Sequence, residues 1–267
     1  MAEPAKARAR GSVNAPLQIP VRFDYVLIVE WLGDRDRRTG AELHQFLTAA
    51  EIPSELVVCG SWAEVCAAVE RARAQIPVRG VPALQLETHA ANPWAGPPES
   101  LGFGLDNVPW VRLHGPLSAL NAASGYRMLV VAAACYGSGI MAAFSGELLP
   151  APFAAAVGLR TEVTEGRLFD AMKELYRGVL RGDAIDHAVE SAQCELADAA
   201  EMRVELGVQI AARIVNNAYY RNARGRQIAP AVAAVRLERA RGLWNAWYPE
   251  WLQEQVPAYG FAATQIA

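Results

Sequence analysis

The stretch Leu129-Val130-Val131-Ala132-Ala133-Ala134-Cys135-Tyr136-Gly137-Ser138-Gly139 decides the fold class of this chain. It begins as an apolar, β-prone run and changes abruptly at a cysteine that small residues and glycines follow. This pattern is typical of a buried parallel strand that brings a thiol to the carboxyl edge of a sheet, where α/β folds place their chemistry.

A second strand with a polar end lies upstream. The segment Leu84-Gln85-Leu86-Glu87-Thr88-His89 ends in a histidine 46 residues before Cys135. A cysteine nucleophile needs an acid–base partner, and this spacing of about 50 residues resembles that of the catalytic dyad in the caspase family. We therefore expect Cys135 to be a nucleophile and His89 its acid–base partner.

Strand and helix patterns alternate on both sides of these two segments. We expect strands at residues 23–30, 55–59, 82–89, 129–134 and 154–159, and helices at residues 40–50, 62–75, 111–123, 167–180 and 184–200. Thr39 with Glu42, and Ser61 with Glu64, fit the capping-box pattern at the first two helix starts. Residues 92–108 predict a hairpin or a long loop beside His89. The alternation predicts an α/β fold with a mostly parallel sheet and helices on both faces.

The two ends of the chain differ in composition from this central part. Residues 1–20 are basic and rich in alanine and proline, without the apolar core of a secretory signal, and indicate a disordered arm in a cytoplasmic protein. Residues 21–200 are expected to form one domain, and residues 201–267 a helical extension packed on it. There Trp244, Trp247 and Trp251 share one helix face, which fits either core packing or a docking surface.

The chain resembles the caspase-like cysteine peptidases, in particular their prokaryotic branch of caspase/CHAT-type domains. The similar segments are residues 87–89 (E-T-H), 110–121, 134–137 (A-C-Y-G) and 155–192, in the family's order. Together they extend over residues 22–195.

This resemblance implies a three-layer, caspase-like (caspase-hemoglobinase) fold and an endopeptidase that cuts a protein partner without a cofactor. It also implies control by activation, through a second protein subunit or through cleavage. Arginine is frequent and lysine occurs only at Lys6 and Lys173, which suggests a GC-rich bacterial gene. In bacteria such peptidases often belong to defence systems.

The backbone near the dyad is expected to bind the oxyanion. The family usually has glycine after its histidine, and that amide helps to bind the oxyanion; here the position is Ala90. The amide of Tyr136 is the second candidate. Glu87 shares a strand face with His89, and a carboxylate in a strand covered on both faces needs a partner. It either supports the active site or makes a structural hydrogen bond.

The specificity of the expected pocket stays open. Relatives that cut after arginine or lysine carry an aspartate two residues before the cysteine, where this chain has Ala133. Asp34, Asp36 or Glu162 could supply an acidic pocket instead, whereas Arg160 would favour an acidic substrate residue.

Composition argues against several other classes. A net charge of −3 gives no case for nucleic-acid binding, and no apolar run is long enough for a membrane helix. Four cysteines without a C-x-x-C pair favour neither a disulfide framework nor a zinc site. Two alternatives remain: a non-catalytic interaction module of the same fold, and a flavodoxin-like enzyme, which would lack any phosphate-binding glycine motif. The oligomeric state stays open.

Overall fold

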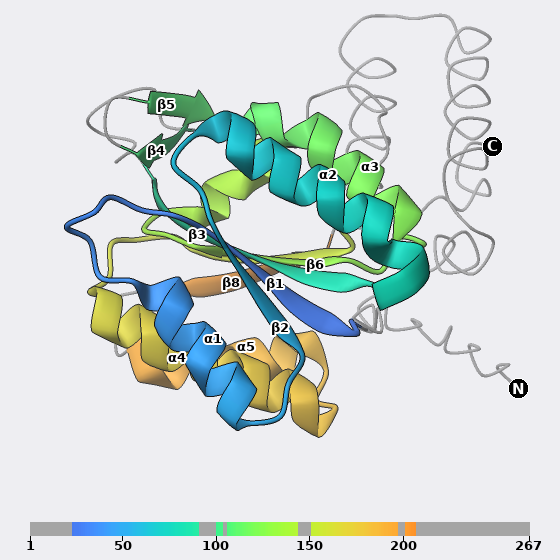
Figure 1. The fold of residues 1–267 in the computed structure, drawn as a ribbon. Coiled ribbons are helices and arrows are strands. Elements are labelled where there is room, and N and C mark those ends of the chain that lie inside the picture. Colours follow the sequence, from blue (N-terminus) through green and yellow to red (C-terminus); the bar gives the residue numbers. More distant parts are fainter. Residues whose placement is uncertain (1–22, 91–99, 104–105, 144–150, 197–200, 207–267) are drawn as a thin grey trace, which may run out of the picture.

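A mostly parallel sheet runs through the middle of the molecule (Figure 1). The description rests on a computed structural model and covers residues 23–90, 100–103, 106–143, 151–196 and 201–206. The expectations for the amino-terminal arm, the tryptophan cluster and the helices after residue 206 lie outside these residues.

Within the described residues the sheet has eight strands, and its main path runs in the order β2-β1-β3-β6-β7-β8. The strands of this path are β1 (Tyr25–Trp31), β2 (Ser54–Val58), β3 (Pro82–Ala90), β6 (Leu129–Ala133), β7 (Ala155–Leu159) and β8 (Met202–Leu206). All neighbours are parallel except β8, which pairs antiparallel with β7. A hairpin of β4 (Ser100–Phe103) and β5 (Asp106–Pro109) pairs with the end of β3.

Helices cover both faces of the sheet, as Figure 1 shows. One face carries α1 (Thr39–Ala49), α4 (Glu165–Arg181) and α5 (Ile185–Leu196); the other carries α2 (Trp62–Arg79), the 3-10 helix η1 (Trp110–Leu113) and α3 (His114–Ala123). Side chains of β1 alternate between the two cores: Val26 and Ile28 pack toward α1 and α4, and Leu27 and Val29 toward α2 and α3. Strands buried on both faces explain the continuous apolar runs in the sequence.

The predicted α/β class and the mostly parallel sheet are confirmed, and the predicted helices and strands lie close to the observed ones. Part of residues 92–108 does form a hairpin, whereas residues 91–99 lie outside the described ranges. None of the helices within the described ranges is long and apolar enough to cross a membrane.

One helix cap is confirmed and one is wrong. The Glu64 amide donates to Ser61 Oγ at 3.3 Å, and the Gly60 amide to the Glu64 carboxylate at 2.6 Å. Thr39 instead lies inside the first turn of α1, and its hydroxyl donates to the buried carboxylate of Glu87 at 2.7 Å. A buried carboxylate needs hydrogen-bond donors, so the Thr39 hydroxyl bonds Glu87 rather than a backbone amide at the helix end.

Strand β8 was not predicted. It lies within the segment after residue 200 that we expected to be helical, so the sheet extends beyond the expected domain boundary. Its sequence, M-R-V-E-L, alternates apolar and polar residues with the period of a strand. Five alternating residues are too few to distinguish a strand from the amphipathic segment around them.

The order of the strands reverses next to β1. The chain passes from β1 to β2 on one side, and then crosses to β3 on the other side of β1. In open α/β sheets, ligands bind outside the carboxyl ends of the strands at such a reversal. The loop after β1 and the end of β3, which carries His89, meet at this point.

Candidate active site

Strands β3 and β6 bring His89 and Cys135 to the same edge of the sheet. The two strands are parallel neighbours, and their last paired residues are Glu87 and Ala133. His89 and Cys135 each lie two residues beyond this pair. Both residues therefore lie just beyond the paired part of two neighbouring strands, at the carboxyl edge of the sheet.

The chain turns sharply at Cys135. The Gly137 amide donates to the carbonyl of Ala134 at 3.0 Å, and Tyr136 has a φ of +56°, in the left-handed region. Such a conformation is uncommon for a residue with a side chain and often occurs at functional turns. The half-buried Cys135 thiol donates to the carbonyl of Val163, with 3.6 Å between sulfur and oxygen.

Glycines let the segment after Cys135 fold back onto the sheet. This segment is the 3-10 helix η2 (Gly137–Ala143). A Cβ added to Gly158 of β7 would lie 2.5 Å from the carbonyl carbon of Gly137, and one added to Gly139 would lie 2.6 Å from Trp110 Nε1. Residues without a Cβ are therefore required here for η2 to pack this closely against β7 and Trp110.

His89 has a carboxylate partner in the loop after β1. Its Nε2 lies 2.8 Å from Asp36 Oδ2, and the amide of Gly33 donates to the same oxygen at 2.6 Å. The hydrogen bond from His89 is the main cause that holds the pKa of Asp36 below its ordinary value. We expected Asp36 as a specificity candidate, and the structure shows it bonded to the predicted acid–base residue.

The partners of His89 and Cys135 come from neighbouring loops. The Arg37 guanidinium, next to Asp36, lies 5.5 Å from the ring of Phe169 in α4. Val163, the partner of the Cys135 thiol, lies two residues before the start of that helix. Among the described residues, His89 and Cys135 are each bonded to their own partner, and no hydrogen bond joins their side chains.

Glu87 is buried in a polar network beneath the loop that carries Asp36. Its carboxylate accepts hydrogen bonds from Thr39 Oγ1 and Gln85 Nε2, both at 2.7 Å. Tyr176 of α4 in turn donates to Gln85 Oε1 at 2.8 Å. Burial raises the pKa of Glu87 to about 7, against the lowering effect of the two donors.

A second buried acid, Glu30, was missed by the sequence analysis. It is fully buried, and the register of β1 and β3 pairs it with Glu87. Its carboxylate lies 2.5 Å from Arg38 Nε and accepts the amide of Ala41 at 3.1 Å. Gly40 fits above it because a Cβ there would lie 2.7 Å from Glu30 Oε2. An acid near the end of the apolar strand YVLIVEW was the signal that could have identified this residue.

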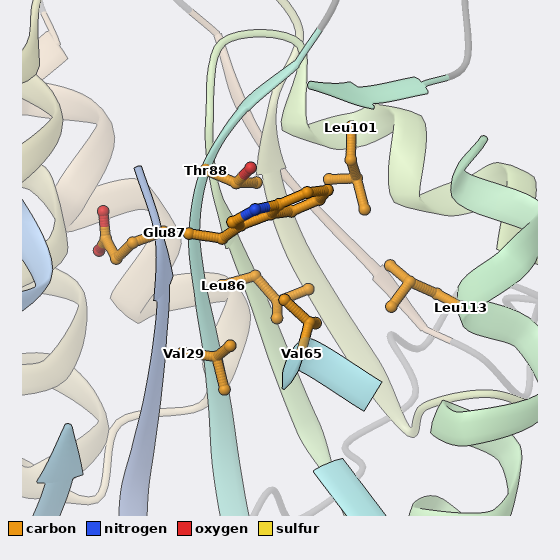
Figure 2. Close-up of a pocket in the computed structure, with 8 residues that line it drawn as sticks. Val29, Val65, Leu86, Glu87, Thr88, Leu101 and Leu113 are labelled. Atoms are coloured by element: carbon orange, nitrogen blue, oxygen red, sulfur yellow. The ribbon is translucent and has the colours of Figure 1, made fainter. Parts of the chain in front are cut away.

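An apolar pocket lies on the opposite face of β3 (Figure 2). Its lining residues come from β1, α2, β3, β4 and η1: Val29, Trp31, Val65, Leu86, Glu87, Thr88, Leu101 and Leu113. Figure 2 shows the Glu87 carboxylate on the other side of β3, away from these apolar side chains. Because side chains alternate along a strand, His89 shares the face of Glu87 and points away from this pocket.

The remaining predicted site residues do not gather into one pocket. Ala90 pairs with Leu101 in the hairpin sheet, and the amide of Tyr136 donates to the Thr161 carbonyl at 3.3 Å. Asp34 is exposed, Tyr136 Oη donates to Glu162 at 3.4 Å, and Arg160 forms an ion pair with Glu201 at 3.1 Å. The charge of Arg160 is thus already compensated.

The described residues gather no group of three or more histidine, cysteine, aspartate or glutamate side chains that could hold a metal ion. No model of a known protein family matches the chain, and no curated protein sequence matches it either. Any function assigned to this site therefore rests on its own geometry and chemistry.

Proposed function

We propose that this protein is a caspase-like cysteine endopeptidase in which Cys135 is the nucleophile and His89 its acid–base partner. The observation that carries the proposal is the register of β3 and β6, which pairs Glu87 with Ala133 two residues before each member of the dyad. The strand-order reversal beside β3 gives independent support, because ligands bind at such positions in α/β sheets.

The proposed reaction has two halves. In the first, the His89 ring takes the thiol proton, and Sγ of Cys135 attacks the carbonyl carbon of the scissile amide, whose π electrons move to oxygen. The intermediate collapses, the C–N bond breaks, and His89 returns its proton to the leaving amine, which leaves a thioester. In the second half, water attacks the thioester carbonyl carbon while His89 takes its proton, the C–S bond breaks, and His89 returns the proton to Sγ of Cys135 as the carboxylic acid leaves.

The developing oxyanion needs hydrogen-bond donors. We propose the amides of Ala90 and Tyr136 for this role. The Tyr136 amide makes a long bond of 3.3 Å to Thr161, so substrate would have to replace that carbonyl. The proposed substrate is a protein, and activation by a second protein subunit in a bacterial defence system belongs to the same proposal.

A non-catalytic module of the same fold is the competing function. Cys135 donates its proton to the Val163 carbonyl rather than to His89, which is the arrangement of a resting or a purely structural thiol. The two functions differ in how reactive Cys135 is, because a thiol with an acid–base partner forms thiolate more readily.

The test is a site-resolved alkylation rate. The chain provides its own reference: Cys194 is an exposed thiol in α5, far along the sequence from the dyad. With limiting iodoacetamide at pH 7, Cys135 should react about tenfold faster than Cys194, measured by peptide mass spectrometry over time. Cys59 and Cys66 should react slowly because burial raises the pKa of both thiols, that of Cys59 to about 11.

The variant His89→Ala should remove the advantage of Cys135 over Cys194 while the fold, checked by circular dichroism, is kept. A wild-type Cys135 that reacts no faster than Cys194 would defeat the dyad and favour the non-catalytic module. A fluorogenic peptide library varied at the residue before the cut, with Cys135→Ala as control, then identifies the specificity.

A further inference from the structure

We propose that Asp36 is the positioning residue of the site. Its carboxylate holds the His89 ring in one orientation and one tautomer, so that the unprotonated Nδ1 acts as the base. The inference rests on the proposed function for the role of Cys135. The pairing of Asp36 with His89 is an observation that stands without it.

The hydrogen-bond geometry fixes which ring nitrogen carries the proton. Asp36 Oδ2 lies 2.8 Å from His89 Nε2 and also accepts the Gly33 amide at 2.6 Å. An ionised carboxylate only accepts hydrogen bonds, so a neutral His89 must carry its proton on Nε2. Nδ1 is then unprotonated, and it is the nitrogen left to take a proton from a thiol.

The loop that carries Asp36 is held at its far end by two buried acids. Arg38 pairs with the fully buried Glu30, and Thr39 donates to the buried Glu87. At the near end, the Asp36 amide donates to the Gly33 carbonyl at 3.0 Å, which closes a tight turn. Asp36 is therefore fixed on both sides, as a residue that must orient another side chain needs to be.

Stability does not account for this pair. The side chains of His89 and Asp36 expose 52% and 29% of their surface, and even a fully charged pair so exposed contributes little to folding. Glu30 and Glu87 anchor the loop and so fix the position of Asp36 relative to His89. We infer that the orientation of this pair, rather than its contribution to stability, is its role. Replacement of Asp36 should thus change reactivity far more than stability.

The experiment compares three variants of the full chain. Asp36→Ala removes the carboxylate, Asp36→Glu keeps it on a longer side chain, and Arg35→Ala removes an exposed side chain from the same loop as the matched control. Two quantities are measured at pH 8: the ratio of the alkylation rates of Cys135 and Cys194, and the tautomer of His89. The tautomer comes from a long-range ¹H–¹⁵N correlation of ¹⁵N-histidine protein, with the spectrum of His89→Gln as assignment.

We expect Asp36→Ala to lower the rate ratio about tenfold and to give a mixture of the two ring tautomers, with thermal unfolding close to wild type. Asp36→Glu should restore part of both, and Arg35→Ala should match wild type. An unchanged tautomer in Asp36→Ala overturns the proposal, as does an equal loss in Arg35→Ala, which would assign the effect to loop folding. If wild-type Cys135 is no faster than Cys194, the proposed function fails, and the tautomer alone decides the role of Asp36.

Discussion

At the scale of single residues, the loop after β1 shows what one sequence can predict about a site. Asp34 and Asp36 are two residues apart, and both were expected as possible pocket acids. The turn from Gly33 to Asp36 directs the second of them at His89. His89 is 53 residues after Asp36. The turn and the strand order decide which of the two loop acids contacts it, and residue type alone predicts neither the turn nor the strand order.

Glu87 leads to a prediction about stability and pH. Burial raises its pKa to about 7, above the ordinary value of 4.5, so between these values the folded state holds a proton that the unfolded chain has lost. The contribution of protonated Glu87 to the free energy of unfolding is complete below about pH 4.5, and it decreases as pH rises through 7. Over this range it amounts to about 3 kcal/mol, from about 1.36 kcal/mol per pKa unit.

The variant Glu87→Gln should remove this loss. Glutamine is neutral at every pH and can bond Gln85 and Thr39, since the threonine hydroxyl can accept as well as donate. In urea unfolding, the variant should match wild type near pH 5 and exceed it at pH 8 by up to about 3 kcal/mol. Glu190→Gln, at an exposed position of α5, is the control. Parallel pH curves for wild type and Glu87→Gln would show that Glu87 is already ionised at pH 5.

At the scale of elements, the packing of η2 against β7 leads to a prediction with a built-in control. Gly158→Ala would place a methyl group 2.5 Å from the Gly137 carbonyl carbon, which must force the turn after Cys135 to move. Overpacking of this kind costs about 1–3 kcal/mol. Apart from its chain neighbours Gly115 of α3 has open space around it, although Pro116 disfavours the helical conformation for a residue with a Cβ at position 115, so Gly115→Ala should change the stability less than Gly158→Ala.

Both effects can be measured by urea unfolding, with Cys135 alkylation as the second readout. Gly158→Ala should slow the labelling of Cys135, because the thiol lies two residues before the start of η2, and Gly115→Ala should leave it unchanged. Equal stability of Gly158→Ala and wild type would mean that the close approach of η2 and β7 is not required.

The elements also show where sequence patterns are sufficient and where they fail. Strands buried on both faces and helices with clear caps, such as α2 after Ser61, were predicted from their local patterns. The two errors have tertiary causes. Thr39 is not the cap residue because its hydroxyl donates to Glu87 instead. Residues 202–206 form a strand because they pair with β7. Neither partner lies close in the sequence.

At the scale of the whole molecule, the alternation of strands and helices predicts the class but not the order of the strands. Chain order alone leaves open which strand lies beside β3. The observed order makes β6 the neighbour of β3, so two strand ends 46 residues apart meet, and it puts the reversal beside β1. His89 and Cys135 could be predicted because each is near the end of a strand with a clear sequence pattern. Asp36 could not, because it lies beside His89 only when β3 is the neighbour of β1.

This topology predicts how protection from hydrogen exchange is distributed. Strands β1 and β6 are buried along their whole length and have neighbours on both sides, so their amides should exchange only through global unfolding. Strand β2 is at the edge and half-buried, and residues 33–38 form a surface turn. Their amides should open locally.

Exchange measured by mass spectrometry should therefore be at least about a hundredfold slower in β1 and β6 than in β2 and residues 33–38, a difference of about 3 kcal/mol in opening free energy. Cys135 would then closely follow one of the most stable strands, with Asp36 on a segment that opens more readily. A ligand that suppresses these local openings would keep Asp36 against His89 without moving the sheet. Equal protection of β6 and residues 33–38 would contradict this division and leave the site fully formed at all times.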